Sequence, residues 1–541
     1  MLGLMQDWPL LCHKILDYSA RQHGDREVVS RSVEGPIVRS NYREIHARSK
    51  KVAQALEADG FGLGDRIATL GWNTARHMEA WYGTMGIGGV YHTLNPRLFP
   101  EQVAWIMNHA EDRAIFVDLS FVPIVEAIAD KVPSLRKIIV LTDEAHLPKE
   151  SKLDLVAYES WIGQMDGDFA WKEFDENTAC GMCYTSGTTG DPKGVLYSHR
   201  SNVLHALIAS QPDALNLGAN EVIMPVVPMF HANAWGIAHA APMVGAKVVH
   251  PGPLMDGASI YELLDTEKVT MTAAVPTVWL MLLAYLEESG KKLPHLNRVV
   301  IGGSACPRAM TEAFQNVYDV EVIHAWGMTE MSPLGSLGSM KPQYADLKGD
   351  ARLDIQEKQG YAPFGVEMKV TDDDDVEAPW DGKTFGKLKV RGPGVAKAYY
   401  GGAGAEQFDD DNWFDTGDVA HINSDGYMQI TDRSKDVIKS GGEWISTIDL
   451  ENLAVGHPDV QEAAVIGIVH PKWDERPLLI CIRKEGRDPS GEEILQFMEG
   501  KIAKWWMPNA VAFVDEIPHT ATGKIQKTEL RKQFADYRFA E

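Results

Sequence analysis

The sequence predicts an α/β protein with two domains. The large N-terminal domain would contain two α/β subdomains with parallel-type sheets and a small β-rich lobe, and a small α+β domain would follow. Three observations predict this. The chain has 541 residues, which exceeds one ordinary compact unit. Helical periodicity alternates with short apolar runs through residue 303. The pattern then changes twice, after residue 360 and near residue 433.

The first half of the chain reads as strands and helices in alternation. Short, continuously apolar runs are typical of strands that are buried on both faces of a parallel sheet. Longer stretches with apolar residues every three to four positions predict the covering helices. Helices are expected over residues 42–60 and 101–109, and strands over 66–70, 114–117, 269–275 and 298–301.

The lobe and the C-terminal domain are predicted from later changes in pattern. Residues 387–391 and 425–430 alternate polar and apolar side chains between turn residues, which is typical of antiparallel strands. Beyond residue 433 mixed patterns predict a compact α+β unit. We expect the domains to be residues 1–432 and 433–541.

The composition restricts the kind of partner. Apolar residues make up 45% of the chain, as in globular proteins, and the formal charge is −24. An acidic field argues against nucleic acid or an anionic membrane as the main partner, so an anionic ligand would need cations gathered locally. The five cysteines form no disulfide framework, which predicts a reducing, cytoplasmic location. We expect neither a signal peptide nor a membrane span.

A loop dense in glycine and hydroxyl residues is the strongest local signal. Residues 184–194 read YTSGTTGDPKG and follow an apolar run that contains Cys180 and Cys183. Glycines allow backbone N–H groups to close around phosphate oxygens, and hydroxyls and a lysine add donors and charge. The spacing is not that of a Walker loop. The alternative is a glycine-rich surface turn. The predicted polyphosphate-binding residues are Thr185, Ser186, Gly187, Thr188, Thr189, Gly190 and Lys193.

Seven further segments follow in a fixed order: PMFHANAWG (228–236), GGSA (302–305), AWGMTE (325–330), WFDTGD (413–418), DRSKD (432–436), IKSGGE (438–443) and TGK (522–524). Together with the loop, they resemble the adenylate-forming superfamily of acyl-CoA synthetases, luciferases and peptide-synthetase adenylation domains. The resemblance covers nearly the whole chain. It implies an enzyme that uses ATP, Mg²⁺ and coenzyme A to activate a small carboxylic acid through an acyl-adenylate.

The resemblance implies a nucleotide site. The aromatic residue of the AWGMTE segment would stack on adenine, Thr329 would donate to the α-phosphate, and Glu330 would hold Mg²⁺, which prefers carboxylate oxygens. Asp418 and Arg433 would bind the ribose. Taken alone, these charged residues could be ordinary surface charges. The remaining implied ATP/AMP-binding residues are Gly303, Ser304, Ala325, Trp326, Gly327 and Met328.

Lys524 is the predicted catalytic residue of the first half-reaction. A carboxylate is already ionised at neutral pH, so the difficulty is to bring it onto an anionic phosphate. A cation that touches both groups relieves this repulsion. By resemblance, Lys439 serves thioester formation and Lys435 is the hinge about which a mobile C-terminal domain swings. The alternative is a static lid with two surface lysines.

The resemblance also implies the acyl and coenzyme A sites. His231 would gate the acyl pocket and belongs to the predicted catalytic set. Trp235, Gly302 and Pro333 would line the same pocket, although a packed core histidine and tryptophan would look the same. Cys180 and Cys183 lack a second ligand pair at zinc-site spacing and are interpreted as part of a buried strand. The predicted coenzyme A path is Lys439, Ser440, Gly441, Gly442 and Glu443.

Within the superfamily, segments 230–236, 378–382 and 432–445 are similar to short- and medium-chain acyl-CoA ligases of the methylmercaptopropionate type. This implies a short or medium-chain acid such as 3-methylmercaptopropionate, and a possible homodimer. Two other functions stay open. One is an adenylation module for a carrier protein, which is disfavoured because the chain ends soon after Lys524. The other is a non-catalytic adenylate sensor, which is disfavoured because no expected catalytic group is replaced.

Overall fold

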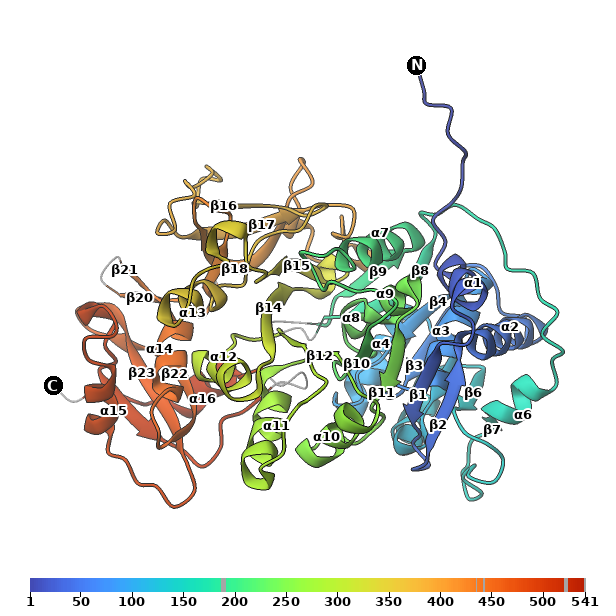
Figure 1. Cartoon of the computed structure of the whole chain (residues 1–541), viewed down its shortest axis with the longest axis horizontal. Coiled ribbons are helices and arrows are strands. Elements are labelled where there is room, and N and C mark those ends of the chain that lie inside the picture. The colour runs from blue at the N-terminus through green and yellow to red at the C-terminus, as the bar shows by residue number, and fades with distance from the viewer. Residues whose placement is uncertain (186–190, 434, 441–442, 520–523, 540–541) are drawn as a thin grey trace.

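The computed structural model of the chain contains four sheets (Figure 1). It describes residues 1–185, 191–433, 435–440, 443–519 and 524–539, with only the backbone of residues 443–444. The described residues form two large α/β sheets, a four-stranded lobe and a five-stranded C-terminal sheet, which confirms the predicted fold class.

The first large sheet has seven strands in the order β7-β6-β5-β3-β4-β8-β9. Its neighbouring strands are parallel except for β8 and β9, which form an antiparallel pair around the glycine-rich loop. The strands are β3 (Arg66–Leu70), β4 (Val90–Thr93), β5 (Ala114–Val117), β6 (Lys137–Val140), β7 (Leu155–Ala157), β8 (Ala179–Tyr184) and β9 (Gly194–Ser198). The helices in this part of the chain are α2 (Tyr42–Ala58), α3 (Ala75–Gly86), α4 (Pro100–Ala110), α5 (Val122–Ile128) and α6 (Tyr158–Gly163).

The second large sheet has eight strands in the order β15-β14-β13-β12-β10-β11-β1-β2. Its strands are β1 (Glu27–Arg31), β2 (Ile37–Asn41), β10 (Val222–Pro225), β11 (Lys247–His250), β12 (Met271–Ala274), β13 (Arg298–Ile301), β14 (Glu321–Gly327) and β15 (Leu334–Leu337). Its helices are α1 (His13–Gln22), α7 (His199–Ala209), α8 (Ala232–Trp235), α9 (Ile237–Val244), α10 (Gly257–Thr266), α11 (Pro276–Ser289) and α12 (Arg308–Glu312).

Strands β1 and β2 were not predicted. They precede the first sheet in the chain but extend the second, because β1 pairs in parallel with β11, more than 200 residues away. The two subdomains therefore share one core, in which Trp81 stacks on Tyr91 with ring centroids 4.3 Å apart. Aromatic side chains of the first subdomain reach across to α9: the Tyr82 hydroxyl donates to the carbonyl oxygen of Ala238 at 3.2 Å, and the Tyr91 hydroxyl is 3.3 Å from His239 Nε2. These buried rings hold the two subdomains together.

The lobe is an antiparallel sheet, β16 (Glu367–Thr371), β17 (Gly386–Arg391), β18 (Phe414–Ile422) and β19 (Met428–Arg433), preceded by α13 (Asp350–Gln356). β19 starts three residues later than the predicted 425–430. The reason is a tight turn: Gly426 has a φ of +83°, and the side chain of Asn423 accepts a hydrogen bond from the N–H of Tyr427.

The C-terminal unit is α+β, as predicted. Its strands are β20 (Ile438–Ser440), β21 (Glu443–Ile445), β22 (Val460–His470), β23 (Asp474–Arg483) and β24 (Ala510–Phe513). Its helices are α14 (Thr447–Val455), α15 (Gly491–Met498) and α16 (Lys527–Gln533). Figure 1 draws this unit in orange and red, at the end of the molecule opposite the first sheet.

All five cysteines are buried free thiols. In the described part of the chain, no helix has the length and hydropathy to cross a membrane.

Candidate active site

A cavity of 410 Å³ opens at the carboxyl ends of β12, β13 and β14. This is where α/β sheets ordinarily bind ligands, because the loops that follow parallel strands meet at that edge. Its walls come from the connection between β8 and β9 of the first sheet, from the second sheet, from the lobe and from the C-terminal unit. Most of the predicted site residues line it: Thr185, Lys193, His231, Trp235, Gly302, Gly303, Ala325, Trp326, Gly327, Met328, Thr329, Glu330, Pro333, Arg433 and Lys524.

The other predicted residues lie elsewhere. Of those that the structure describes, Ser304, Asp418, Lys435, Lys439 and Ser440 do not line the cavity. Five residues of the glycine-rich loop and two of the coenzyme A path lie outside the described residues, and the side chain of Glu443 is not described either. The residues outside the description are Ser186, Gly187, Thr188, Thr189, Gly190, Gly441 and Gly442.

Asp418 lies directly behind the cavity wall. Its Oδ2 accepts a hydrogen bond from Trp326 Nε1 at 3.0 Å, and its Oδ1 is 3.0 Å from Arg433 Nε. Asp418 and Arg433 are opposite each other on β18 and β19, so strand pairing fixes this contact. Three residues predicted for the nucleoside end of ATP thus form one hydrogen-bonded group.

Glu330 is held by a residue that the sequence did not single out. The hydroxyl of Tyr399 donates to Glu330 Oε1 at 2.6 Å, and both side chains are buried. A buried carboxylate in a polar cavity offers the oxygen ligand that Mg²⁺ prefers, so the group fits the predicted metal role. Tyr399 also lies beneath Lys193, whose Nζ is 4.8 Å from the ring centre and donates to Gln407 Oε1 at 2.6 Å.

Lys524 enters the cavity from the C-terminal unit and is partly buried. Burial and the charge of Arg433 lower its pKa to about 8, although Asp418 and Glu330 act in the opposite direction. Lys524 also influences His231. Burial, Lys524 and Arg97 together lower the pKa of His231 to about 4. At neutral pH this imidazole is uncharged and can bind a carboxylate by hydrogen bonding alone.

The deep end of the cavity is apolar. Besides Trp235 and Pro333, its walls include five residues that sequence reasoning missed: Leu215, Ile237, Ala273, Val300 and Leu334. Gly302 brings the backbone close to Trp235. A Cβ at position 302 would lie 2.8 Å from the carbonyl oxygen of Ala325 and 3.2 Å from the Trp235 ring, so only glycine fits there without a shift.

Trp235 is presented by an unusual backbone. Ala232, Asn233, Ala234, Trp235 and Gly236 all have φ between +45° and +77°, which makes α8 a left-handed turn. Each non-glycine residue in this conformation costs roughly 1–2 kcal/mol. Such strain persists where surrounding structure enforces it, commonly at functional sites. This turn joins His231, the predicted gate of the acyl pocket, to Trp235, which is predicted to line it.

Lys439 and Lys435 are exposed and lie outside the cavity that receives Lys524. Lys439 is on β20, where its N–H donates to Glu475 Oε2 at 3.2 Å. The next residue, Ser440, is buried, and its hydroxyl lies 3.2 Å from Arg476 Nη1. The two lysines predicted for the two half-reactions are therefore in different surroundings, one in the cavity and one at the surface.

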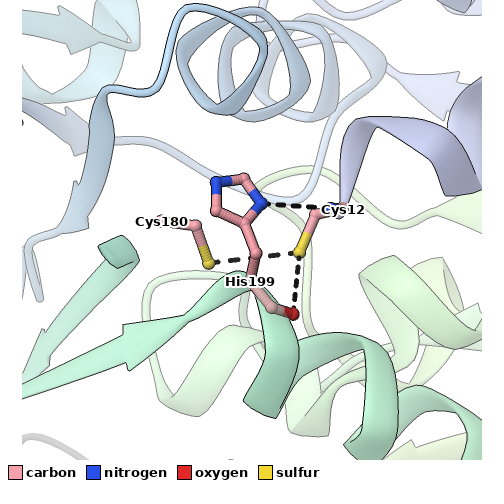
Figure 2. Close-up of side chains that lie close together, drawn as sticks. All are labelled: Cys12, Cys180 and His199. Carbon is pink, nitrogen blue, oxygen red and sulfur yellow. Dashed lines mark hydrogen bonds between the residues drawn. The ribbon is translucent and has the colours of Figure 1, made fainter. Parts of the chain in front are cut away.

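Cys180 is part of a buried strand, as interpreted from the sequence, and it meets a histidine and a second cysteine (Figure 2). The Sγ atoms of Cys12 and Cys180 are 4.0 Å apart. His199 Nδ1 accepts a hydrogen bond from the Cys12 N–H at 3.0 Å, so the lone pair that a metal would need is already used. We interpret this group as packing of the N-terminal segment against β8.

Comparison with known proteins identifies the family. The AMP-binding enzyme model matches residues 16–400, and the model of the AMP-binding enzyme C-terminal domain matches residues 449–524. The chain belongs to the AMP-binding enzyme family. It is an AMP-forming acid–thiol ligase, whose substrates are a carboxylic acid, ATP and coenzyme A.

Members of the AMP-binding enzyme family resemble the chain over its full length. It is 49% identical to the 3-methylmercaptopropionyl-CoA ligase of Ruegeria lacuscaerulensis and 46% identical to the medium-chain-fatty-acid–CoA ligase of Ectopseudomonas oleovorans. The alignments cover 99% of this chain in both cases, and 99% and 98% of the two relatives. The crystal structure of the anthranilate CoA ligase AuaEII with anthranoyl-AMP superposes with a TM-score of 0.87 at 26% identity, covering 98% and 100% of the two chains.

Proposed function

We propose that the enzyme converts 3-methylmercaptopropionate, ATP and coenzyme A to the acyl-CoA thioester, AMP and pyrophosphate. The main support for this substrate is that the chain is 49% identical, along the full length of both chains, to a ligase named for this acid. Medium-chain fatty acids are the second candidate, supported by the relative that is 46% identical.

The apolar end of the cavity supports an uncharged acyl tail. Leu215, Ile237, Ala273 and Val300 surround it, and an alkyl chain or a thioether would bury there without leaving a polar group unpaired. A thioether sulfur is polarizable and packs well against aromatic rings such as that of Trp235. A second carboxylate at this end would be buried without a partner, which disfavours dicarboxylic acids.

In the first half-reaction the acid needs no general base, since it is ionised at neutral pH. Lys524 would bind both the carboxylate and the α-phosphate and reduce their repulsion as pyrophosphate leaves. Thr329 would donate to the α-phosphate, and Asp418 and Arg433 would bind the ribose. Glu330, held by Tyr399, would be the Mg²⁺ ligand, and the metal would neutralise phosphate charge.

The second half-reaction needs a thiol at the acyl carbon. We propose that residues 433–541 form the mobile domain and that they turn about Lys435 to withdraw Lys524. This turn would bring Lys439, Ser440 and the backbone of Gly441 and Gly442 to the coenzyme A path. The exposure of Lys435 and Lys439 supports this, because neither is locked in the core.

The proposal also includes the compartment and the oligomeric state of the enzyme. Five buried free thiols fit a reducing, cytoplasmic compartment. The homodimer is a prediction from resemblance alone, which light scattering on the purified protein would test.

A panel of acids tests the substrate. Linear acids of two to ten carbons and 3-methylmercaptopropionate would be compared for pyrophosphate release and thioester formation, with and without coenzyme A. We expect the highest kcat/KM for 3-methylmercaptopropionate. Each buried methylene contributes about 0.8 kcal/mol, about fourfold in kcat/KM, until the cavity is full.

Two results would redirect the proposal. A maximum at eight to ten carbons would favour the medium-chain candidate. Full pyrophosphate turnover without coenzyme A, together with transfer to an added carrier protein, would favour an adenylation module instead.

A further inference from the structure

A buried group of three charged side chains and one threonine joins the lobe to the C-terminal unit. It consists of Asp432 on β19, Thr447 and Glu451 on α14, and Lys527, the first residue of α16. Asp432 is 1% exposed, and the side chains of Lys527 and Glu451 are 9% and 12% exposed. Charged side chains are this deeply buried only where they have partners.

The contacts of this group form a chain. Asp432 Oδ2 accepts hydrogen bonds from the N–H and the hydroxyl of Thr447, at 2.9 and 2.5 Å. Lys527 Nζ donates to the same hydroxyl and lies 2.8 Å from Glu451 Oε1. Because Thr447 is at the first turn of α14, the Asp432 carboxylate also occupies the positive end of that helix.

Asp432 is the member of the group that belongs to the lobe. Its backbone pairs with Val419 of β18, so its position is set by the lobe sheet. Glu451 instead accepts a hydrogen bond from the N–H of Val465 on β22, inside the C-terminal unit. The contact of Asp432 with Thr447, whose hydroxyl also accepts from Lys527, therefore crosses from one unit to the other.

A second ion pair lies one turn further along α16. Arg531 Nη1 is 2.8 Å from Asp436 Oδ1. Lys527 and Arg531 are spaced i, i+4, so they share a helix face. Asp436, the partner of Arg531, and Asp432, which Lys527 reaches through the hydroxyl of Thr447, flank the proposed hinge residue Lys435. One face of α16 thus holds the chain on both sides of the hinge.

The charges explain why Lys527 matters. Burial raises the pKa of Asp432 and raises that of Glu451 to about 7, and Lys527 opposes both shifts. Although burial lowers it, the pKa of Lys527 is raised by Glu451 and Asp432. Without this cation, two buried carboxylates would face each other uncompensated, and the lobe and α14 would be pushed apart.

We propose that Asp432 and Lys527 form an interdomain latch that holds Lys524 in the cavity for the first half-reaction, and that Asp432 is released for the second. Lys527 is then a positioning residue: it lies three positions after Lys524 and fixes the segment that carries it. A turn of the C-terminal unit about Lys435 would separate Asp432 from Thr447, while the pair of Lys527 with Glu451 would travel with the unit. The inference rests on the proposed role of Lys524.

The test measures the half-reactions separately in the full-length enzyme. Adenylation is followed as pyrophosphate release in single turnovers, and thioester formation is started from supplied acyl-adenylate. The variants are Lys527→Met, Lys527→Arg and Asp432→Asn. The matched control is Lys532→Met on the exposed face of α16, where Lys532 pairs with Glu529 of the same helix at 3.1 Å.

We expect Lys527→Met and Asp432→Asn to slow adenylation, by up to about 100-fold, since displacement of a catalytic group by about 1 Å can cost this much. Thioester formation should change by less than about threefold. Lys527→Arg should recover part of the adenylation rate, because it keeps the cation. Lys532→Met should resemble the wild type in both steps.

Equal losses in both half-reactions, or no loss in either, would overturn the latch. Asp432→Asn keeps the test valid if Lys527→Met fails to fold, since it leaves the pair of Lys527 with Glu451 intact. The role of Lys524 is checked separately with Lys524→Ala. If that variant adenylates normally, the proposed function of Lys524 fails; if it is inactive while Asp432→Asn is normal, only the latch fails.

Discussion

At the scale of single residues, Lys524 carries most of the proposed chemistry. It is the group by which the C-terminal unit contributes positive charge to a cavity that must hold a carboxylate and a triphosphate. Its pKa is lowered to about 8, chiefly by burial and by Arg433. The charge that catalysis needs is thus present below that pH and lost above it.

We therefore expect kcat/KM for adenylation to fall as pH rises through about 8, and the decrease should approach tenfold per pH unit at higher pH. The relevant pKa is that of the free enzyme, because the pH dependence of kcat/KM reports the free enzyme. His231, with a pKa of about 4, stays neutral throughout and does not contribute to this limb. The carboxylic acid stays ionised over the same range, and a terminal phosphate, with a second pKa of about 6, is fully ionised where the limb falls. A stopped-flow profile from pH 6.5 to 10 measures the limb, and a flat profile to pH 10 would contradict it.

The residues visible from sequence were those in short segments with a chemical signature. Glycines beside hydroxyls, or a carboxylate within an ordered series of segments, stand out in the linear chain. Tyr399, Gln407 and Arg97 carry no such signature. They reach Glu330, Lys193 and His231 only after distant parts of the chain come together, so no local pattern could have predicted them.

At the scale of elements, the acyl end of the cavity depends on two backbone features. The left-handed turn over residues 232–236 presents Trp235, and the glycine after β13 leaves room for its ring. Strand β13 itself was predictable, because the short apolar run within residues 298–301 favours a buried strand. The left-handed turn was not predictable: asparagine adopts a positive φ more readily than most residues, but alanine and tryptophan give no local reason for one.

Gly302→Ala tests the close approach. The new methyl group would meet the carbonyl of Ala325 and the Trp235 ring, so the ring must shift into the acyl pocket or the backbone must move. We expect a loss of about 1–3 kcal/mol in unfolding free energy. We also expect a rise in KM for the acid that increases with chain length, with KM for ATP changed less.

Urea denaturation and steady-state kinetics over three chain lengths would measure these effects. Gly218→Ala is the control, because a Cβ at that position has no atom within 4 Å. A uniform change in KM for every acid would contradict an effect of the Trp235 ring.

At the scale of the whole molecule, the layers were predictable and their assembly was not. Alternating patterns gave two α/β subdomains, a lobe and an α+β unit. The assignment of β1 to the second sheet depends on pairing with β11 across most of the N-terminal domain, which no local pattern contains. In the same way, the cavity exists because the second sheet, the lobe and the C-terminal unit converge.

In the proposed reaction, the C-terminal unit supplies one lysine to each half-reaction. The most direct test is to measure both half-reactions in Lys524→Ala and Lys439→Ala. We predict that Lys524→Ala slows adenylation by about 10² to 10³ and spares thioester formation from supplied acyl-adenylate, and that Lys439→Ala does the reverse with a smaller effect. Equal losses of both steps in both variants, or full adenylation by Lys524→Ala, would contradict it.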